Sequence, residues 1–230
     1  MNAIILAAGM GTRLRPLTNE IPKCLVKVCG EPMVERQIRF LREAGIDDIT
    51  LVSGYKAEAL DYLKDKFGVD IIFNAKYDTC NNIWSLVKVL SRFGDTYVIE
   101  GDVYMEAGCF DKTLSEPTYF AVNKRYEREW GLETDKDLNL LRVNIGSGEG
   151  YIMSGISYWP REAADIISEE IRRLISADEY TDLFWDNAVL NVLPQITSRM
   201  NVKVSPAPIL HEIDTEPELR ALEKFLRSSV

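Results

Sequence analysis

The sequence is poor in the residues that build metal–thiolate sites. It has four cysteines and one histidine in 230 residues. No two cysteines form a CxxC pair, and His211 lies far along the chain from all of them, so a structural zinc site is not expected. We expect free thiols in a reducing compartment. The cysteines are Cys24, Cys29, Cys80 and Cys109.

Long apolar segments are also missing near the N-terminus. The longest uncharged stretch there, AIILAAGM (3–10), is too short to span a bilayer and lacks the basic flank and cleavage site of a signal peptide. We therefore expect a cytoplasmic protein without membrane insertion. Internal repeats, low-complexity tracts and linkers are absent too. This favours a single domain that comprises residues 1–230. Fusion to a pathway enzyme, or joint action with one, is left open by the sequence.

Positive charge is scarce. There are 36 acidic residues against 27 lysines and arginines, and the formal net charge is −9. Broad binding of nucleic acid requires a basic face, so it is not expected. A small anionic ligand remains compatible, because a few local cations suffice to bind it.

Short strands and helices alternate along the first hundred residues. Short apolar runs indicate buried strands, and apolar residues at helical spacing, ended by Gly45 or Gly68, indicate helices. Strands are predicted at 3–7, 47–54, 69–74 and 96–102, and helices at 33–45, 57–68 and 82–90. The alternation predicts an α/β fold with a Rossmann-like, mixed, mostly parallel sheet and helices on both faces.

The pattern changes after Asp102. Two strands are predicted with a polar excursion between them, followed by two helices, a further strand and a C-terminal helix that Thr215 would cap. The predicted ranges are 118–125 and 151–159 for the strands, 160–176 and 183–192 for the helices, 202–205 for the last strand and 215–228 for the last helix.

The string LAAGMGTRLRPLTNEIPK (6–23) joins the first strand to the first helix. Gly9 and Gly11 lack Cβ atoms, so backbone N–H groups can approach phosphate oxygens closely. The spacing is neither that of the Walker A loop nor GxGxxG. For the glycines alone, a tight turn with solvated arginines would be the simpler explanation.

The complete string resembles the signature of nucleotidyltransferases that act on sugar phosphates and related phosphates, which reads L-A-A-G-x-G-T-R-L, then P-x-T, then P-K. The resemblance implies the nucleotide-diphospho-sugar transferase fold. It implies that Arg13 binds the leaving pyrophosphate and that Lys23 meets the α-phosphate, where negative charge builds during transfer. The nucleotide itself would be held by Leu6, Ala7, Ala8, Gly9, Met10, Gly11 and Thr12.

Two aspartates complete the implied site. Asp102 follows a predicted strand, at the edge of an open α/β sheet where ligands bind. Asp214, in EIDTEPEL, resembles the second metal-binding aspartate of the family. Nucleotidyl transfer needs Mg²⁺ to screen two anions that must meet, and carboxylates suit that ion. Taken alone, Asp102 would be a turn residue and Asp214 a residue near a helix cap.

Later motifs resemble a small-phosphate branch of the family, the CTP:phosphocholine and 2-aminoethylphosphonate cytidylyltransferases. The resemblance covers essentially the whole chain. It implies that CTP is the nucleotide, that a small phosphorylated or phosphonate amine is the acceptor, and that the chain divides into a nucleotide-binding part (about 1–115), an acceptor-binding part in a small substrate-side subdomain (about 116–210) and the C-terminal helix. The motifs are YDTCNNIWSL (77–86), EREWGL (127–132), SGISYW (154–159) and DLFWDN (182–187).

Tryptophans next to carboxylates suggest how an amine would bind. A quaternary ammonium binds to ring faces, whereas a primary ammonium needs hydrogen-bond acceptors. We assign Trp159 to the core and leave Trp84 undecided. Phe184 and Gly131 stand where the family often has a tyrosine and a bulky residue, so the choice of acceptor is open. The predicted acceptor residues are Glu129, Trp130, Asp182, Trp185 and Asp186.

Asn82 is predicted to bind the nucleotide. Asn81, Asn82 and Ser85 could each contact the nucleotide or the acceptor phosphate. They could instead cap the helix that follows. Two other functions are weighed against the cytidylyltransferase. A sugar-1-phosphate nucleotidylyltransferase would more naturally have a polar pocket than one with tryptophans, and an inactive regulatory module would have lost at least one of the implied catalytic and metal-binding residues.

Overall fold

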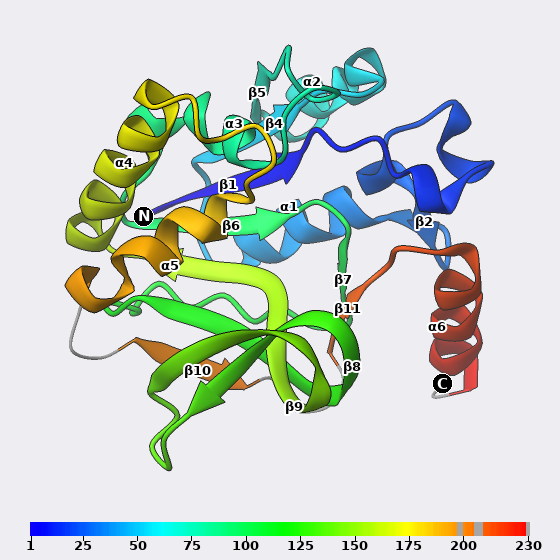
Figure 1. The fold of residues 1–230 in the computed structure, drawn as a ribbon. Coiled ribbons are helices and arrows are strands. Elements are labelled where there is room, and N and C mark those ends of the chain that lie inside the picture. Colours follow the sequence, from blue (N-terminus) through cyan, green and yellow to red (C-terminus); the bar gives the residue numbers. More distant parts are fainter. Residues whose placement is uncertain (197–199, 205–208, 229–230) are drawn as a thin grey trace.

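A seven-stranded sheet runs through the centre of the molecule (Figure 1). The structure is a computed structural model that describes residues 1–196, 200–204 and 209–228. Among the described strands of this sheet, β9 alone runs antiparallel to its neighbours, so the predicted mixed, mostly parallel sheet is confirmed. In spatial order the strands are β10 (Asn201–Val204), β8 (Thr118–Thr134), β9 (Leu140–Trp159), β6 (Thr96–Glu100), β1 (Asn2–Ala7), β4 (Ile49–Ser53) and β5 (Asp70–Phe73).

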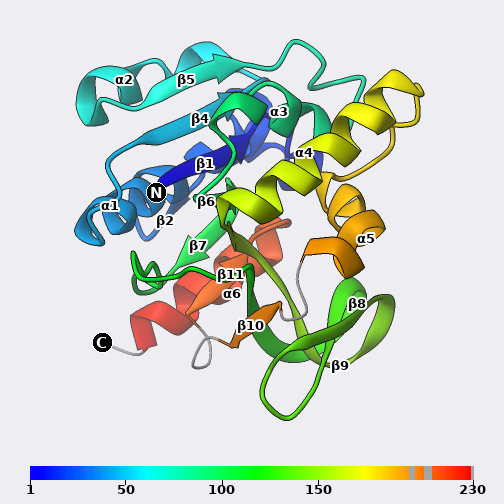
Figure 2. The ribbon, with the colours of Figure 1, turned by 90° about the vertical axis from the view of Figure 1, so that its left-hand side faces the viewer.

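Helices cover both faces of the sheet, as Figure 2 shows. Successive side chains of a strand point to opposite faces, and β1 follows this rule because Ile4 and Ile5 belong to different apolar clusters. A continuous apolar run in the sequence therefore marks a strand buried on both sides. One face carries α1 (Met33–Glu43) and α2 (Tyr62–Phe67), and the other carries α3 (Ile83–Val87), α4 (Arg161–Ser176) and α5 (Trp185–Ile196).

Two short antiparallel pairs lie at the end of the sheet where the candidate site forms. β7 (Val103–Met105) pairs with β11 (Leu210–Glu212), and β2 (Lys27–Val28) pairs with β3 (Glu31–Pro32). The C-terminal helix α6 (Glu216–Ser228) packs its buried leucines into a cluster with the β2 strand and the loop before it. None of these short strands was predicted, because two or three residues carry no periodic signal.

The prediction that the two strands are interrupted between residues 125 and 151 is wrong. β8 and β9 continue through it as a long curled hairpin with several bulges. Between Asn123 and Glu149 the side chains are exposed or half-buried on both faces, Leu132 excepted. The apolar–polar alternation that reveals a half-buried strand is therefore absent there.

Two predicted helices are shorter than expected. The helix predicted at 57–68 is a 3₁₀ turn followed by α2, and the helix predicted at 82–90 reaches only Val87 before a 3₁₀ turn at Leu90–Arg92. The strand predicted at 202–205 is β10, although Ser205 lies outside the described residues. The division of the chain near residue 115 stays a prediction. None of the helices in the described ranges is long and apolar enough to cross a membrane.

Candidate active site

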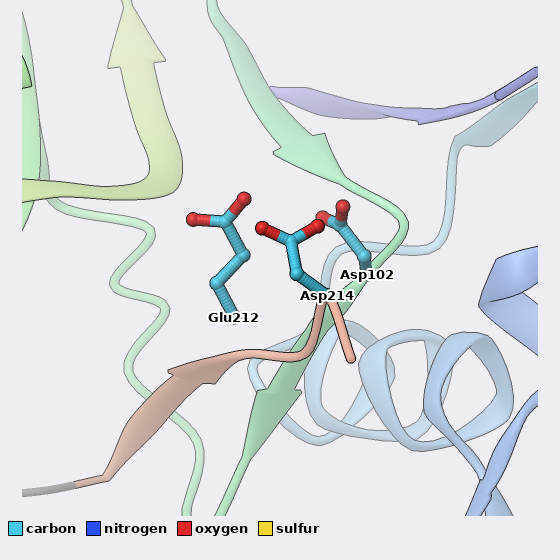
Figure 3. Close-up of side chains that lie close together, drawn as sticks. All are labelled: Asp102, Glu212 and Asp214. Carbon is cyan, nitrogen blue, oxygen red and sulfur yellow. The ribbon is translucent and has the colours of Figure 1, made fainter. Parts of the chain in front are cut away.

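Three carboxylates meet beside the end of β6. Asp102 lies in the turn between β6 and β7, Glu212 ends β11, and Asp214 follows two residues later. Each offers an oxygen atom, and these atoms lie within 4.8 Å of one another. Figure 3 shows the three side chains directed toward a common space. The antiparallel β7–β11 pair and a hydrogen bond from the Ile213 N–H to the Asp102 carbonyl (3.2 Å) hold the two segments together.

Lys23 bridges two of these carboxylates. Its Nζ lies 2.5 Å from Asp102 Oδ2 and 2.6 Å from Asp214 Oδ1. Burial alone would lower the pKa of this ammonium, but the attraction of both carboxylates outweighs burial and the pKa is raised. Arg13, which is 69% exposed, also donates to Asp214 Oδ1, at 2.8 Å. The structure thus brings together the predicted catalytic pair and the predicted metal ligands.

The donor set fits a hard divalent cation. Asp102 Oδ1 is buried and has no hydrogen-bond partner among the described residues. An unpaired carboxylate oxygen out of contact with water is costly, so a ligand is expected to complete it. Burial, followed by the negative charges of Asp102 and Asp214, raises the pKa of Glu212. Oxygen ligands of this kind are those that Mg²⁺ prefers.

A first cavity, here called the strand-end cavity, opens where β1 ends. Its volume is about 220 Å³. The predicted residues Leu6, Ala7, Ala8, Gly9 and Asn82 line it. The remaining lining residues are Lys23, Cys24, Asn74, Tyr77, Cys80, Asn81, Ser85, Glu100, Gly101, Asp102 and Phe184.

The rest of the glycine-rich loop lies outside this lining. Met10, Gly11 and Thr12 were predicted to contact the nucleotide, but the described cavity does not include them. The backbone explains why position 11 is a glycine. Its φ is +57°, and an added Cβ would stand 2.9 Å from the Cβ of Lys23. This glycine therefore lets the loop pack against the base of Lys23.

A second cavity, here called the hairpin cavity, lies between the β8–β9 hairpin and the start of α5. Its volume is about 660 Å³. The predicted acceptor residues Glu129, Trp130, Trp185 and Asp186 line it. The other lining residues are Arg13, Lys23, Asn82, Val98, Glu100, Asp102, Tyr119, Glu127, Arg128, Met153, Gly155, Ile156, Ser157, Phe184, Glu212 and Asp214.

The acceptor residues differ in their exposure to this cavity. Trp130 meets Phe184 edge to face with ring centroids 6.0 Å apart. Trp185 is only 3% exposed and packs edge to face on Trp159, so much of its ring is core. Asp186 accepts a hydrogen bond from the Tyr119 hydroxyl at 2.9 Å. Burial raises the pKa of Asp186 to about 7, against the lowering effect of that bond.

The structure does not bring Asp182 into either described cavity. Its side chain is exposed, and its backbone carbonyl accepts a hydrogen bond from Asn81 Nδ2 (3.4 Å). The difference is local. Trp185 and Asp186 lie in the first turn of α5 and line the hairpin cavity, whereas Asp182 lies in the turn before the helix. Trp159 is fully buried, as predicted. Trp84 stacks on Tyr180 and lies outside both linings.

Sequence reasoning missed two residues of this site. Glu212 precedes Asp214 by two residues, and the period of two along a strand places such residues on one side. That spacing could have identified Glu212. Tyr119, whose hydroxyl meets Asp186, gave no comparable signal, because it lies in an apolar run that predicts only a buried strand.

Cys24 lines the strand-end cavity but is a poor nucleophile. Its side chain is buried, and burial raises the pKa of its thiol to about 12. The thiolate is the reactive form of cysteine. A covalent intermediate on Cys24 at neutral pH is therefore disfavoured.

Comparisons with known proteins agree with this geometry. Residues 2–118 match the family described as Nucleotidyl transferase. The chain is 39% identical to the choline-phosphate cytidylyltransferase of Streptococcus pneumoniae over 99% of both chains, and 32% identical to the 2-aminoethylphosphonate cytidylyltransferase of Lancefieldella rimae over 96% of this chain and 92% of the relative. A solved structure of CTP:phosphocholine cytidylyltransferase from Streptococcus pneumoniae superposes with a TM-score of 0.94, at 40% identity and 98% coverage of both chains.

Proposed function

The chain belongs to the nucleotidyl transferase family, and we propose that it is a cytidylyltransferase that transfers CMP from CTP to the phosphate or phosphonate of a small amine. One observation carries the proposal. Lys23 and Asp102 line both the strand-end cavity, suited to a nucleotide, and the hairpin cavity, suited to an amine, and Glu212 and Asp214 join them from the hairpin cavity.

The reaction joins the ligands of the two cavities. An acceptor oxygen forms a bond to the α-phosphorus of CTP, and the bond from that phosphorus to the bridging β-phosphate oxygen breaks, so that pyrophosphate leaves with the bonding electrons. Lys23 counters the charge that grows on the α-phosphate, and exposed Arg13 guides the departing pyrophosphate. The Leu6–Gly9 backbone orients the nucleotide.

Asp102, Asp214 and Glu212 would hold Mg²⁺ in this proposal. When bound, the ion supplies positive charge that screens the nucleotide and acceptor phosphates from each other. Glu212 adds a third carboxylate to the pair implied by the sequence. The buried, unpaired Oδ1 of Asp102 supports this assignment.

Phosphocholine is the acceptor that we place first. Trp130 and Phe184 line the hairpin cavity and offer ring surface to a trimethylammonium group. 2-Aminoethylphosphonate is the second candidate, because Glu127, Glu129 and Asp186 could accept hydrogen bonds from a primary ammonium. A sugar 1-phosphate offers neither kind of cation and fits this wall less well.

A pyrophosphate-release assay tests the function. Each of the four nucleoside triphosphates is combined with phosphocholine, 2-aminoethylphosphonate or glucose 1-phosphate in the presence of Mg²⁺. We expect release with CTP and an amine, with phosphocholine as the faster acceptor. Release with glucose 1-phosphate alone would contradict the proposal, and no release with any pair would favour an inactive regulatory module.

The two acceptors should respond differently to mutation of the hairpin cavity. Trp130→Leu removes a ring face, and a good cation–π contact contributes about 0.5–2 kcal/mol, so it should lower kcat/KM more for phosphocholine. Glu129→Gln removes a charge-assisted acceptor, a loss of about 1.5–3 kcal/mol, so it should lower kcat/KM more for 2-aminoethylphosphonate. The KM for CTP should stay nearly constant. A lower melting temperature with unchanged acceptor kinetics would make Trp130 a core residue.

Acceptor binding should depend on the ionisation of Asp186. Because its pKa is raised to about 7, this carboxyl is mostly neutral below that pH and mostly charged above it. A cationic acceptor gains from the charged form, so its KM should fall as the pH rises from about 6 to about 8. Asp186→Asn should remove this part of the pH profile and leave the titration of the acceptor phosphate itself. An identical profile in both proteins would show that Asp186 does not face the cation.

A further inference from the structure

Asn82 stands in the wall shared by the two cavities. Its side chain lies between the end of β6 and the start of α5. Nδ2 donates a hydrogen bond to Glu100 Oε1 at 3.0 Å, and Oδ1 accepts one from the Trp185 backbone N–H at 2.9 Å. One amide therefore joins the nucleotide side of the site to the helix that carries the acceptor residues.

The neighbouring backbone strengthens this connection. The Asn81 N–H donates to the Thr181 carbonyl at 2.8 Å, and Asn81 Nδ2 donates to the Asp182 carbonyl at 3.4 Å. Together with the bond from the Trp185 N–H to Asn82 Oδ1, three hydrogen bonds join the segment before α3 to the start of α5 and the turn before it. The Phe184 N–H donates to Asn187 Oδ1 at 2.9 Å within that turn. The first N–H groups of a helix have no partner inside the helix, and Asn82 satisfies the one of Trp185. Since Trp185 is 3% exposed, water could not easily replace this bond.

Both ends of the Asn82 amide are thus committed to protein partners, which fixes its orientation. We propose that Asn82 is a positioning residue that sets Trp185 and Asp186 relative to the bound nucleotide, and that it controls the use of the acceptor more than the binding of CTP. The inference rests on the proposed function and changes the role that the sequence suggested for Asn82. The pair Asn82–Glu100 is the element that transmits the effect.

Asn82→Ala tests the position of the helix directly. Amide hydrogen exchange of the peptide covering 184–189 should become about 10-fold faster or more, because the Trp185 N–H loses its partner. Exchange of the 6–12 loop should not change. The matched control is Asn144→Ala, which also removes an amide–carboxylate bond, to Glu133 at 3.2 Å, but on the exposed hairpin. Unchanged exchange at 184–189 in the Asn82 variant would overturn the proposal, whatever the acceptor is.

Kinetics and a reciprocal exchange separate positioning from ligand contact. Asn82→Asp keeps an acceptor for the Trp185 N–H but turns a second oxygen toward Glu100. It should lower kcat/KM for the acceptor about 10-fold or more, with the CTP dissociation constant changed less than about 3-fold. Adding Glu100→Gln restores a donor–acceptor pair with reversed roles and should recover much of the loss. No recovery would show that the Asn82–Glu100 pair does not transmit the effect. A parallel loss of CTP affinity would make Asn82 a nucleotide ligand instead. A wild-type enzyme that uses no amine acceptor would refute the proposed function, while the exchange experiment would still decide the role of Asn82.

Discussion

Replacing Lys23 by alanine is expected to lower kcat by about 10²-fold or more. The Lys23 ammonium is held between Asp102 and Asp214, only 14% exposed, at the junction of the two cavities. From this position it can counter charge that appears on the α-phosphate only as the reaction proceeds. Groups that stabilise the transition state more than the ground state act on kcat rather than on KM alone.

The measurement is steady-state kinetics with saturating acceptor and varied CTP. Lys27→Ala is the matched control, because it removes the same charge from an exposed position on β2. It should leave kcat unchanged. If Lys23→Ala raises the KM for CTP at constant kcat, Lys23 serves ground-state binding and the assigned role is wrong.

Asp102→Asn should reduce Mg²⁺-dependent turnover by about 10³-fold, since a metal ion contributes several kcal/mol of charge stabilisation. The change keeps the shape of the side chain and one oxygen that can accept a hydrogen bond from the Lys23 ammonium. It removes the negative charge and one oxygen of the group whose Oδ1 is buried without a partner among the described residues. We therefore expect a folded protein with weak metal binding.

Two measurements check this prediction, Mn²⁺ binding to the nucleotide-free protein and turnover as a function of Mg²⁺ concentration. Asp165→Asn, an exposed position on α4, is the control for loss of one negative charge. Near-normal turnover of Asp102→Asn at low Mg²⁺ would exclude Asp102 as a ligand. Glu212, which the structure places in the same cluster, would then be the first candidate.

The sequence predicted the fold best where the signal is local. The run 3–7 is apolar at every position because β1 is buried on both faces, and the string 6–23 is one continuous segment. The long hairpin was mispredicted because it bends away from the core, so its strands have no apolar face to reveal them. Whether a side chain reaches a cavity was hardest to predict. Trp185 and Asp182 lie in one motif, yet the first is mostly core and the second is exposed.

The site residues also differ in how far their roles can be predicted without the tertiary structure. Asp102 follows directly from the end of a strand, where ligands of α/β sheets bind. The contact between Asp186 and the Tyr119 hydroxyl joins positions far apart in sequence. The burial that raises the pKa of Asp186 is likewise a property of the folded structure, which the sequence does not reveal. The need for glycine at position 11 could not be predicted either. It depends on the tertiary position of the Lys23 Cβ, which a Cβ added at Gly11 would approach too closely.

The β7–β11 pair has a consequence for the order of folding. β1, β4, β5 and β6 all come from the first hundred residues, so their pairing requires no residue beyond Glu100. Leu210–Glu212 must find Val103–Met105 across a loop of roughly a hundred residues, and such long-range closure is entropically costly and slow. Lys23 and Asp102 can therefore be in place while Asp214 is still distant. Docking of β11 against β7 would then complete the acidic cluster, because it brings Glu212 and Asp214 to Asp102.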